Sequence, residues 1–135
     1  MKVTGRCRCG EIAFEAEVDP NAAHICHCRD CQTLTGSAFR VALQVPPGKF
    51  RLLKGDPKIY IKVADNGSHR GHAFCGACGS PVYRFPTDNN PTYSLRVGSL
   101  SQRAELGAPQ RHYWVKRRLP WVTHLGDIPG FQGQT

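Results

Sequence analysis

The chain has 135 residues, of which 18 are Lys or Arg and 10 are Asp or Glu, giving a formal net charge of +8. This length fits one domain, residues 1–135, and is too short for two complete cores. Because its 14 Gly and 10 Pro interrupt helices, the composition excludes a helix bundle, while recurring apolar strand faces exclude disorder.

Short alternating segments separated by turn residues predict strands along most of the chain. The first is Glu11–Val18, where apolar residues at every second position share one face. Further strands are predicted over 38–45, 50–53, 58–63, 69–74, 81–85, 93–97 and 110–116. The expected apolar faces are Ile12, Phe14, Ala16 and Val18 in the first strand, Phe39, Val41, Leu43 and Val45 in the second, and Ile59, Ile61 and Val63 in the fourth.

Turn and helix signals complete this prediction. Asp65–Gly67 predicts a hairpin turn. Residues 29–35 are the one segment expected to form a turn or two of helix, and residues 126–135 are expected to be irregular. The sequence therefore predicts an all-β domain, mainly antiparallel, with little helix.

No apolar run approaches the roughly twenty residues of a membrane span, and the first residues lack the apolar segment of a signal peptide. We therefore expect a cytoplasmic protein whose thiols stay reduced. The excess of basic residues favours an anionic partner, either a nucleic acid or a small acidic substrate.

Seven cysteines are the strongest signal in the sequence. They form the patterns Cys7-x-Cys9, Cys26-x-Cys28-x-x-Cys31 and Cys75-x-x-Cys78. An odd count in a reducing compartment argues against disulfides, and the close spacing argues for metal ligands. Zinc takes four tetrahedral ligands and accepts thiolates readily, and a closely spaced pair can supply two of them from one turn.

The count divides as four plus three. Cys7, Cys9, Cys75 and Cys78 would close one structural zinc site. Cys26, Cys28 and Cys31 would then form a three-ligand set with an open position, which is the arrangement of a catalytic zinc. Two zinc ions per chain are therefore expected.

Other interpretations of the same cysteines stay open at this point. The outer four could be unrelated buried thiols. The central three could hold a second structural zinc with a fourth ligand from His24 or His27, or could replace one outer pair. A redox role for Cys28-x-x-Cys31 is weaker, because the expected βαβ context is missing.

The ligand type at the central site suggests its chemistry. Three thiolates leave a zinc ion a poor Lewis acid, which acidifies bound water less than zinc held by neutral histidines. Such a site can still bind an incoming thiol as thiolate. The sequence thus favours thiol chemistry over water activation.

Residues 5–10, 26–31, 35–37 and 74–80, which contain all seven cysteines, resemble the glutathione-dependent formaldehyde-activating enzyme family, which includes centromere protein V. Softer similarity extends through Val97–Leu100, His112, Trp121 and Leu125–Pro129. The resemblance implies a zinc-bound β-tent fold like that of methionine sulfoxide reductase B. It also implies a structural zinc on Cys7, Cys9, Cys75 and Cys78, and a catalytic zinc on Cys26, Cys28 and Cys31.

The activity that the resemblance implies is that of a carbon–sulfur lyase, which joins formaldehyde to glutathione as S-hydroxymethylglutathione. The expected partner is therefore a small thiol. The alternative is a non-catalytic zinc module that binds protein or nucleic acid through its basic surface. Basic and aromatic residues gather near the C-terminus, where they could form a solvated strand face with core aromatics, attract the carboxylates of glutathione or, with less support, bind single-stranded nucleic acid. They are Arg103, Arg111, His112, Tyr113, Trp114, Lys116, Arg117, Arg118 and Trp121.

Overall fold

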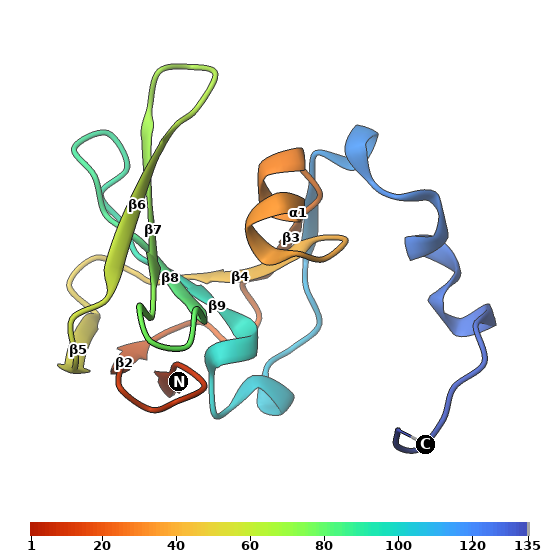
Figure 1. Cartoon of the computed structure of the whole chain (residues 1–135), viewed down its shortest axis with the longest axis horizontal. Helices are drawn as coiled ribbons and strands as arrows, with labels where there is room; N and C mark the ends of the chain where they lie inside the picture. The colour runs from red at the N-terminus through yellow and green to blue at the C-terminus, as the bar shows by residue number, and fades with distance from the viewer. Residues whose placement is uncertain (135) are drawn as a thin grey trace.

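The computed structural model describes residues 1–134 and arranges them in two β-sheets (Figure 1). The smaller sheet has the order β1-β2-β5, with β1 (Lys2–Arg6), β2 (Ala13–Glu17) and β5 (Phe50–Lys54). The larger sheet has the order β10-β3-β4-β9-β8-β7-β6, with β3 (Ala23–Cys26), β4 (Arg40–Gln44), β6 (Lys58–Val63), β7 (His69–Phe74), β8 (Pro81–Phe85), β9 (Ser94–Arg96) and β10 (Arg111–Tyr113).

Helix is scarce, as predicted. The α-helix α1 (Arg29–Thr35) occupies the segment expected to be helical. Short 3-10 segments are η1 (Val97–Ser99), η2 (Arg103–Glu105), η3 (Val115–Arg117) and η4 (Pro120–Asp127). Among residues 1–134, every strand pairing is antiparallel except that of β10 with β3. The predicted fold class, mainly antiparallel β with little helix, is confirmed.

The core lies between the two sheets. The predicted apolar face of β2 and its flanks is confirmed, since Ile12, Phe14, Ala16 and Val18 are at most 5% exposed. From the larger sheet, the cross-strand neighbours Leu43, Leu95, Tyr83 and Ala73 form a buried row facing this core. Phe14 packs edge-on against Tyr83, with ring centroids 5.4 Å apart, and so joins the two sheets.

The opposite face of the larger sheet carries a row of polar side chains. Strand alternation puts Arg40 and Ala42 on the face away from Leu43, and the register continues this row to Arg96, directly opposite Ala42. Arg40 is nevertheless only 6% exposed and Arg96 only 9%. The sequence placed the apolar residues of β4 in one phase, but Arg40 and Ala42 in the other phase are buried too, and Cys31 of α1 lies against Arg40.

Strand β6 forms one edge of the larger sheet, paired with β7 through the predicted hairpin turn. The amide of Gly67 donates to the carbonyl of Ala64 at 2.9 Å, and Gly67 adopts a positive φ of 85°, which favours glycine. The side chains of Ile59, Ile61 and Val63 share a face, as predicted, but are 37–61% exposed.

The C-terminal region differs most from expectation. Strand β10 ends at Tyr113 instead of Lys116, because Trp114 adopts a left-handed conformation with φ 58°. After it, η3 and η4 run down one side of the molecule in blue (Figure 1). The tail expected to be irregular begins inside η4, and Thr135 lies outside the described residues. Within the described residues, no helix has the length and apolarity to cross a membrane.

Candidate metal centres and the cleft beside them

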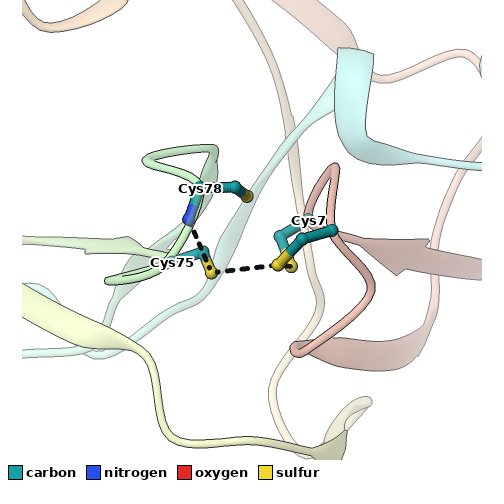
Figure 2. A group of neighbouring side chains, drawn as sticks. Cys7, Cys75 and Cys78 are labelled. Carbon is teal, nitrogen blue, oxygen red and sulfur yellow. Dashed lines mark hydrogen bonds between the residues drawn. The ribbon is translucent and has the colours of Figure 1, made fainter.

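The first candidate metal centre lies between two hairpin loops. Cys7 and Cys9 follow β1, and Cys75 and Cys78 lie between β7 and β8. One ligand atom from each of the four comes within 4.8 Å of the others. Figure 2 shows the sulfur atoms of Cys7 and Cys75 pointing toward one another, with Cys78 on the same loop as Cys75.

The sulfur spacing fits a tetrahedral metal. Zinc–sulfur bonds of about 2.3 Å at tetrahedral angles place neighbouring sulfurs about 3.8 Å apart. The Sγ atoms of Cys7 and Cys9 are 3.6 Å apart, and those of Cys9 and Cys75 are 3.7 Å apart. Four thiols at this spacing form a donor set that could hold zinc.

Backbone amides around these loops point toward sulfur. The amide of Ile12 donates to Cys7 Sγ at 3.2 Å, and that of Ala77 donates to Cys75 Sγ at 3.4 Å. The glycines that close the turns, Gly10 and Gly79, have φ of 84° and 78°, which side chains other than glycine rarely adopt. The turns are thus built to present thiolates, since N–H donors stabilise a negative sulfur.

Electrostatic interactions in the loop that carries Cys75 and Cys78 also favour a thiolate. The hydroxyl of Ser80 lies 3.2 Å from Cys78 Sγ, and this contact, with the Ser80 amide, lowers the pKa of Cys78 to about 5. Cys78 is therefore able to form a thiolate at neutral pH.

The second candidate metal centre comes from a single stretch of chain. Cys26 ends β3, Cys28 is the N-cap of α1, and Cys31 lies in its first turn. Their sulfur atoms also lie within 4.8 Å of one another. The amide of Cys31 donates to Cys28 Sγ at 3.3 Å, so the helix start itself directs this thiol. Three thiols this close likewise fit zinc.

Arg40 lies against this group. It is the register partner of Cys26 on the neighbouring strand, and its Nε donates to Cys31 Sγ at 3.4 Å. The hydrogen bond that the Cys26 thiol donates, and after it the contact with Arg40, lower the pKa of Cys31 to about 5. The same hydrogen bond raises the pKa of Cys26, because Cys26 keeps the proton. Arg40 thus stabilises negative charge on the sulfur of Cys31.

The C-terminal segment supports the same loop. The amide of His27 donates to the carbonyl of Tyr113 at 3.0 Å, which continues the parallel pairing of β10 with β3. Gln32 Nε2 donates to the carbonyls of His27, at 2.8 Å, and Arg117, at 3.0 Å. The three-cysteine loop is thus tied to residues more than 80 positions later in the chain.

A cleft of about 490 Å³ is lined by residues of, or next to, both cysteine groups. Cys7 lines it, and so does Arg40, which contacts Cys31, whereas Cys26, Cys28 and Cys31 themselves do not. Its remaining charged lining side chains are Arg6, Arg8, Arg96 and Arg103. A volume of this size is within the range of small-molecule sites.

The sequence comparison decides the family. The family model described as glutathione-dependent formaldehyde-activating enzyme matches residues 2–117. The chain belongs to this family. The fold is also that of a solved crystal structure of a Rhodobacter sphaeroides protein, with a TM-score of 0.61 and 22% sequence identity, covering 81% of this chain and 98% of that chain.

The positions of the thiols in this family member bear on the interpretations that spacing left open. The outer cysteines form one group and are not replaced by the central three. Within residues 1–134, no histidine or carboxylate donor joins Cys26, Cys28 and Cys31. His27 is fully buried, with Nε2 3.0 Å from His112 Nδ1, and His24 packs against the ring of Tyr113. Neither histidine supplies the fourth donor.

Two residues that line the cleft in this family member, Arg40 and Arg96, were not found from the sequence. In the sequence, Arg40 and Arg96 occupy strand positions that are expected to face solvent. Their burial is visible only in the structure. Of the basic and aromatic residues near the C-terminus, Arg103 alone lines the cleft. Lys116 instead lies over the ring of Trp114, 5.1 Å from its centroid.

Proposed function

We propose that this chain is a zinc-dependent carbon–sulfur lyase that joins formaldehyde, or a related aldehyde, to glutathione or a similar thiol. In this reaction the thiol sulfur forms a bond to the carbonyl carbon, and the thiol proton ends on the oxygen of the new hemithioacetal. Atoms balance without an oxidant or reductant. Family membership supports the reaction class, and the family description names glutathione and formaldehyde.

The observation that carries the proposal is the three-cysteine group beside a cationic cleft. Cys26, Cys28 and Cys31 would hold the catalytic zinc, leaving a position for a ligand that the protein does not supply. Zinc bound there would keep a thiol substrate as thiolate near neutral pH. Arg40 lies within hydrogen-bond distance of Cys31 and faces the cleft, so it stabilises negative charge on sulfur where the thiol enters.

The chain's contribution is mainly positioning. Thiols add to formaldehyde without a catalyst, so the protein need only hold the two reactants together and favour the thiolate. Phe39 and Val41 line the cleft near Arg40 and give it an apolar part. Gln32 fixes the loop that carries the cysteines by binding two carbonyls from separate segments.

For the four-cysteine group we propose a structural zinc. Cys7 and Cys75 are 1% and 2% exposed, and the group joins a loop of the smaller sheet to a loop of the larger one. Metal binding there would contribute directly to folding.

Exchange NMR tests the activity. We expect the zinc-loaded chain to accelerate interconversion of glutathione and S-hydroxymethylglutathione at fixed formaldehyde, compared with buffer alone. The matched control is Cys28→Ser, which keeps a good helix N-cap but removes one thiolate. Equal rates for the chain, the variant and buffer would refute the proposed function.

Native mass spectrometry tests the metal content separately. We expect two zinc ions per chain and retention of glutathione mass after addition of glutathione. A single zinc ion, unaffected by glutathione, would favour the alternative of a binding module.

A further inference from the structure

The cleft beside the cysteine groups is unusual in its charge. Five arginines line it, and none of its described lining residues is acidic. Arg6, Arg8 and Arg103 are exposed, whereas Arg40 and Arg96 are buried. A guanidinium carries its charge at any physiological pH, so burial of two of them near one another needs an explanation.

The sheet register explains how the buried pair comes together. Arg40 and Ala42 are two residues apart on β4, and Ala42 lies opposite Arg96 on β9, so the two arginines share a face. Arg84 and His72 continue the same face on β8 and β7, through the pairs Arg84–Ser94 and His72–Arg84. Four basic side chains thus form one row across four strands.

Arg96 lacks the partner that a buried guanidinium needs. Its Nη2 donates to His72 Nδ1 at 3.2 Å, but its Nε is buried with no hydrogen-bond partner in the described part of the chain. Burial, and then the charges of Arg96 and Arg40, lower the pKa of His72 to about 3, so this histidine is neutral and supplies no negative charge. Burial and the nearby Arg40 likewise lower the pKa of Arg96 to about 9, although the charge of Cys31 opposes this shift.

Thiolate charge offsets only part of the charge of the two buried arginines, since the Cys31 thiolate contacts Arg40 and raises the pKa of Arg96 only at longer range. Arg40 touches Cys31 and so balances the three-cysteine group directly. No hydrogen bond or ion pair joins Arg96 to a cysteine or a carboxylate among residues 1–134. An uncompensated buried charge is costly, so its retention at the wall of a cleft points to a ligand that supplies the missing anion.

We propose that Arg96, with Arg40 beside it, binds a carboxylate of an anionic thiol substrate inside this cleft, while the exposed Arg6, Arg8 and Arg103 attract the substrate's remaining negative charge. This proposal rests on the proposed function for the identity of the substrate as a thiol. It makes Arg96 a specificity-determining residue, which selects peptide thiols with free carboxylates over neutral thiols of similar size. Planar guanidinium groups suit this task because they bind carboxylates through paired hydrogen bonds.

Calorimetric binding of S-methylglutathione to the zinc-loaded full chain tests the site without catalysis. This probe keeps both carboxylates but has no free thiol, so it cannot undergo the reaction. We expect it to bind, and we expect its diethyl ester to bind at least about tenfold more weakly. Arg96→Gln should weaken binding of the free acid by about tenfold or more and leave the ester unchanged.

A matched set of variants controls for loss of charge and of structure. Arg111→Gln removes the same charge from an exposed position that does not line the cleft, and should change affinity less than about twofold. Arg6→Gln removes an exposed arginine from the cleft lining, and should weaken binding about two- to fivefold. If circular dichroism shows that Arg96→Gln does not fold, the ester comparison and Arg6→Gln carry the test.

The proposal is overturned if acid and ester bind equally, or if Arg96→Gln and Arg6→Gln behave like Arg111→Gln. It is also overturned if inorganic phosphate binds in an Arg96-dependent way and S-methylglutathione does not, because the site would then take a phosphate. Failure of the exchange assay with intact, Arg96-dependent binding would refute the proposed lyase activity and leave the carboxylate site standing.

Discussion

The two cysteine groups of this chain use the same donor atom in different topological settings. The four-cysteine group joins loops from two sheets, with Cys9 and Cys75 66 positions apart in the chain. The three-cysteine group comes from one loop and the helix after it, and links no distant elements by itself. A metal at the first site closes a long loop, whereas a metal at the second closes almost none. From this difference in topology we propose that a metal at the first site supports folding, whereas one at the second supports chemistry.

The largest effect should follow removal of a thiol from the four-cysteine group. We expect Cys75→Ser to lose zinc and most of the folding free energy, because structural zinc contributes about 10 kcal/mol, comparable to the whole stability of a domain. The melting temperature should fall by more than about 20 °C in circular dichroism, if a transition remains at all. Ala77→Ser, an exposed change in the same loop, should melt within a few degrees of the wild type.

The same Cys→Ser change in the three-cysteine group should reduce activity strongly and stability only slightly. Cys28→Ser should lose one zinc ion by native mass spectrometry and reduce exchange activity by about a hundredfold or more, since the residue would be a metal ligand. Its melting temperature should fall by no more than about 5 °C, because serine preserves the N-cap of α1. Unfolding as severe as that of Cys75→Ser would contradict the division of roles.

A smaller effect should follow loosening of the loop that carries the three cysteines. Gln32→Ala removes the two hydrogen bonds to the carbonyls of His27 and Arg117, at a cost of about 1–3 kcal/mol. We expect zinc affinity at this site to fall about tenfold in a competition titration with a chromophoric chelator. Zinc at the four-cysteine site should be unaffected, and simultaneous weakening of both sites would show that they are coupled.

The smallest effect concerns pH. The pKa of His72 is lowered to about 3 by burial and by the arginines around it. Below its ordinary pKa of about 6.5, the unfolded chain takes up a proton that the folded chain refuses, so stability is lost as pH falls. Urea unfolding at pH 7.5 and pH 5.5 should show a decrease that is larger in the wild type than in His72→Gln by up to about 1 kcal/mol. Some decrease remains in the variant, because burial also lowers the pKa of His24 and of His27. An equal decrease in both proteins would show that His72 does not cause the loss of stability.

The sequence predicted the strands with strict alternation, the hairpin turn at Gly67 and the helix at 29–35, because these signals are local. It did not predict β1 or β3, which carry the chain into two of the cysteine clusters. Both are short, and β3 contains His24 and Cys26, so neither shows a clear apolar period. They form strands because they pair with β2 and β4, respectively, and not because of a periodic pattern in their own residues.

What the sequence by itself determined is the chemistry of the donor atoms. The spacings Cys7-x-Cys9, Cys26-x-Cys28-x-x-Cys31 and Cys75-x-x-Cys78 placed the ligands in close clusters, because residues within one turn stay near one another in any fold. What only the tertiary structure decided is which pairs meet and what surrounds them. The burial of Arg40 and Arg96 depends on the register of β4 against β9 and on the cover over that face. A charged residue at an alternating position is expected to face solvent until the opposing layer is known, so these arginines and the cleft they line became visible only in three dimensions.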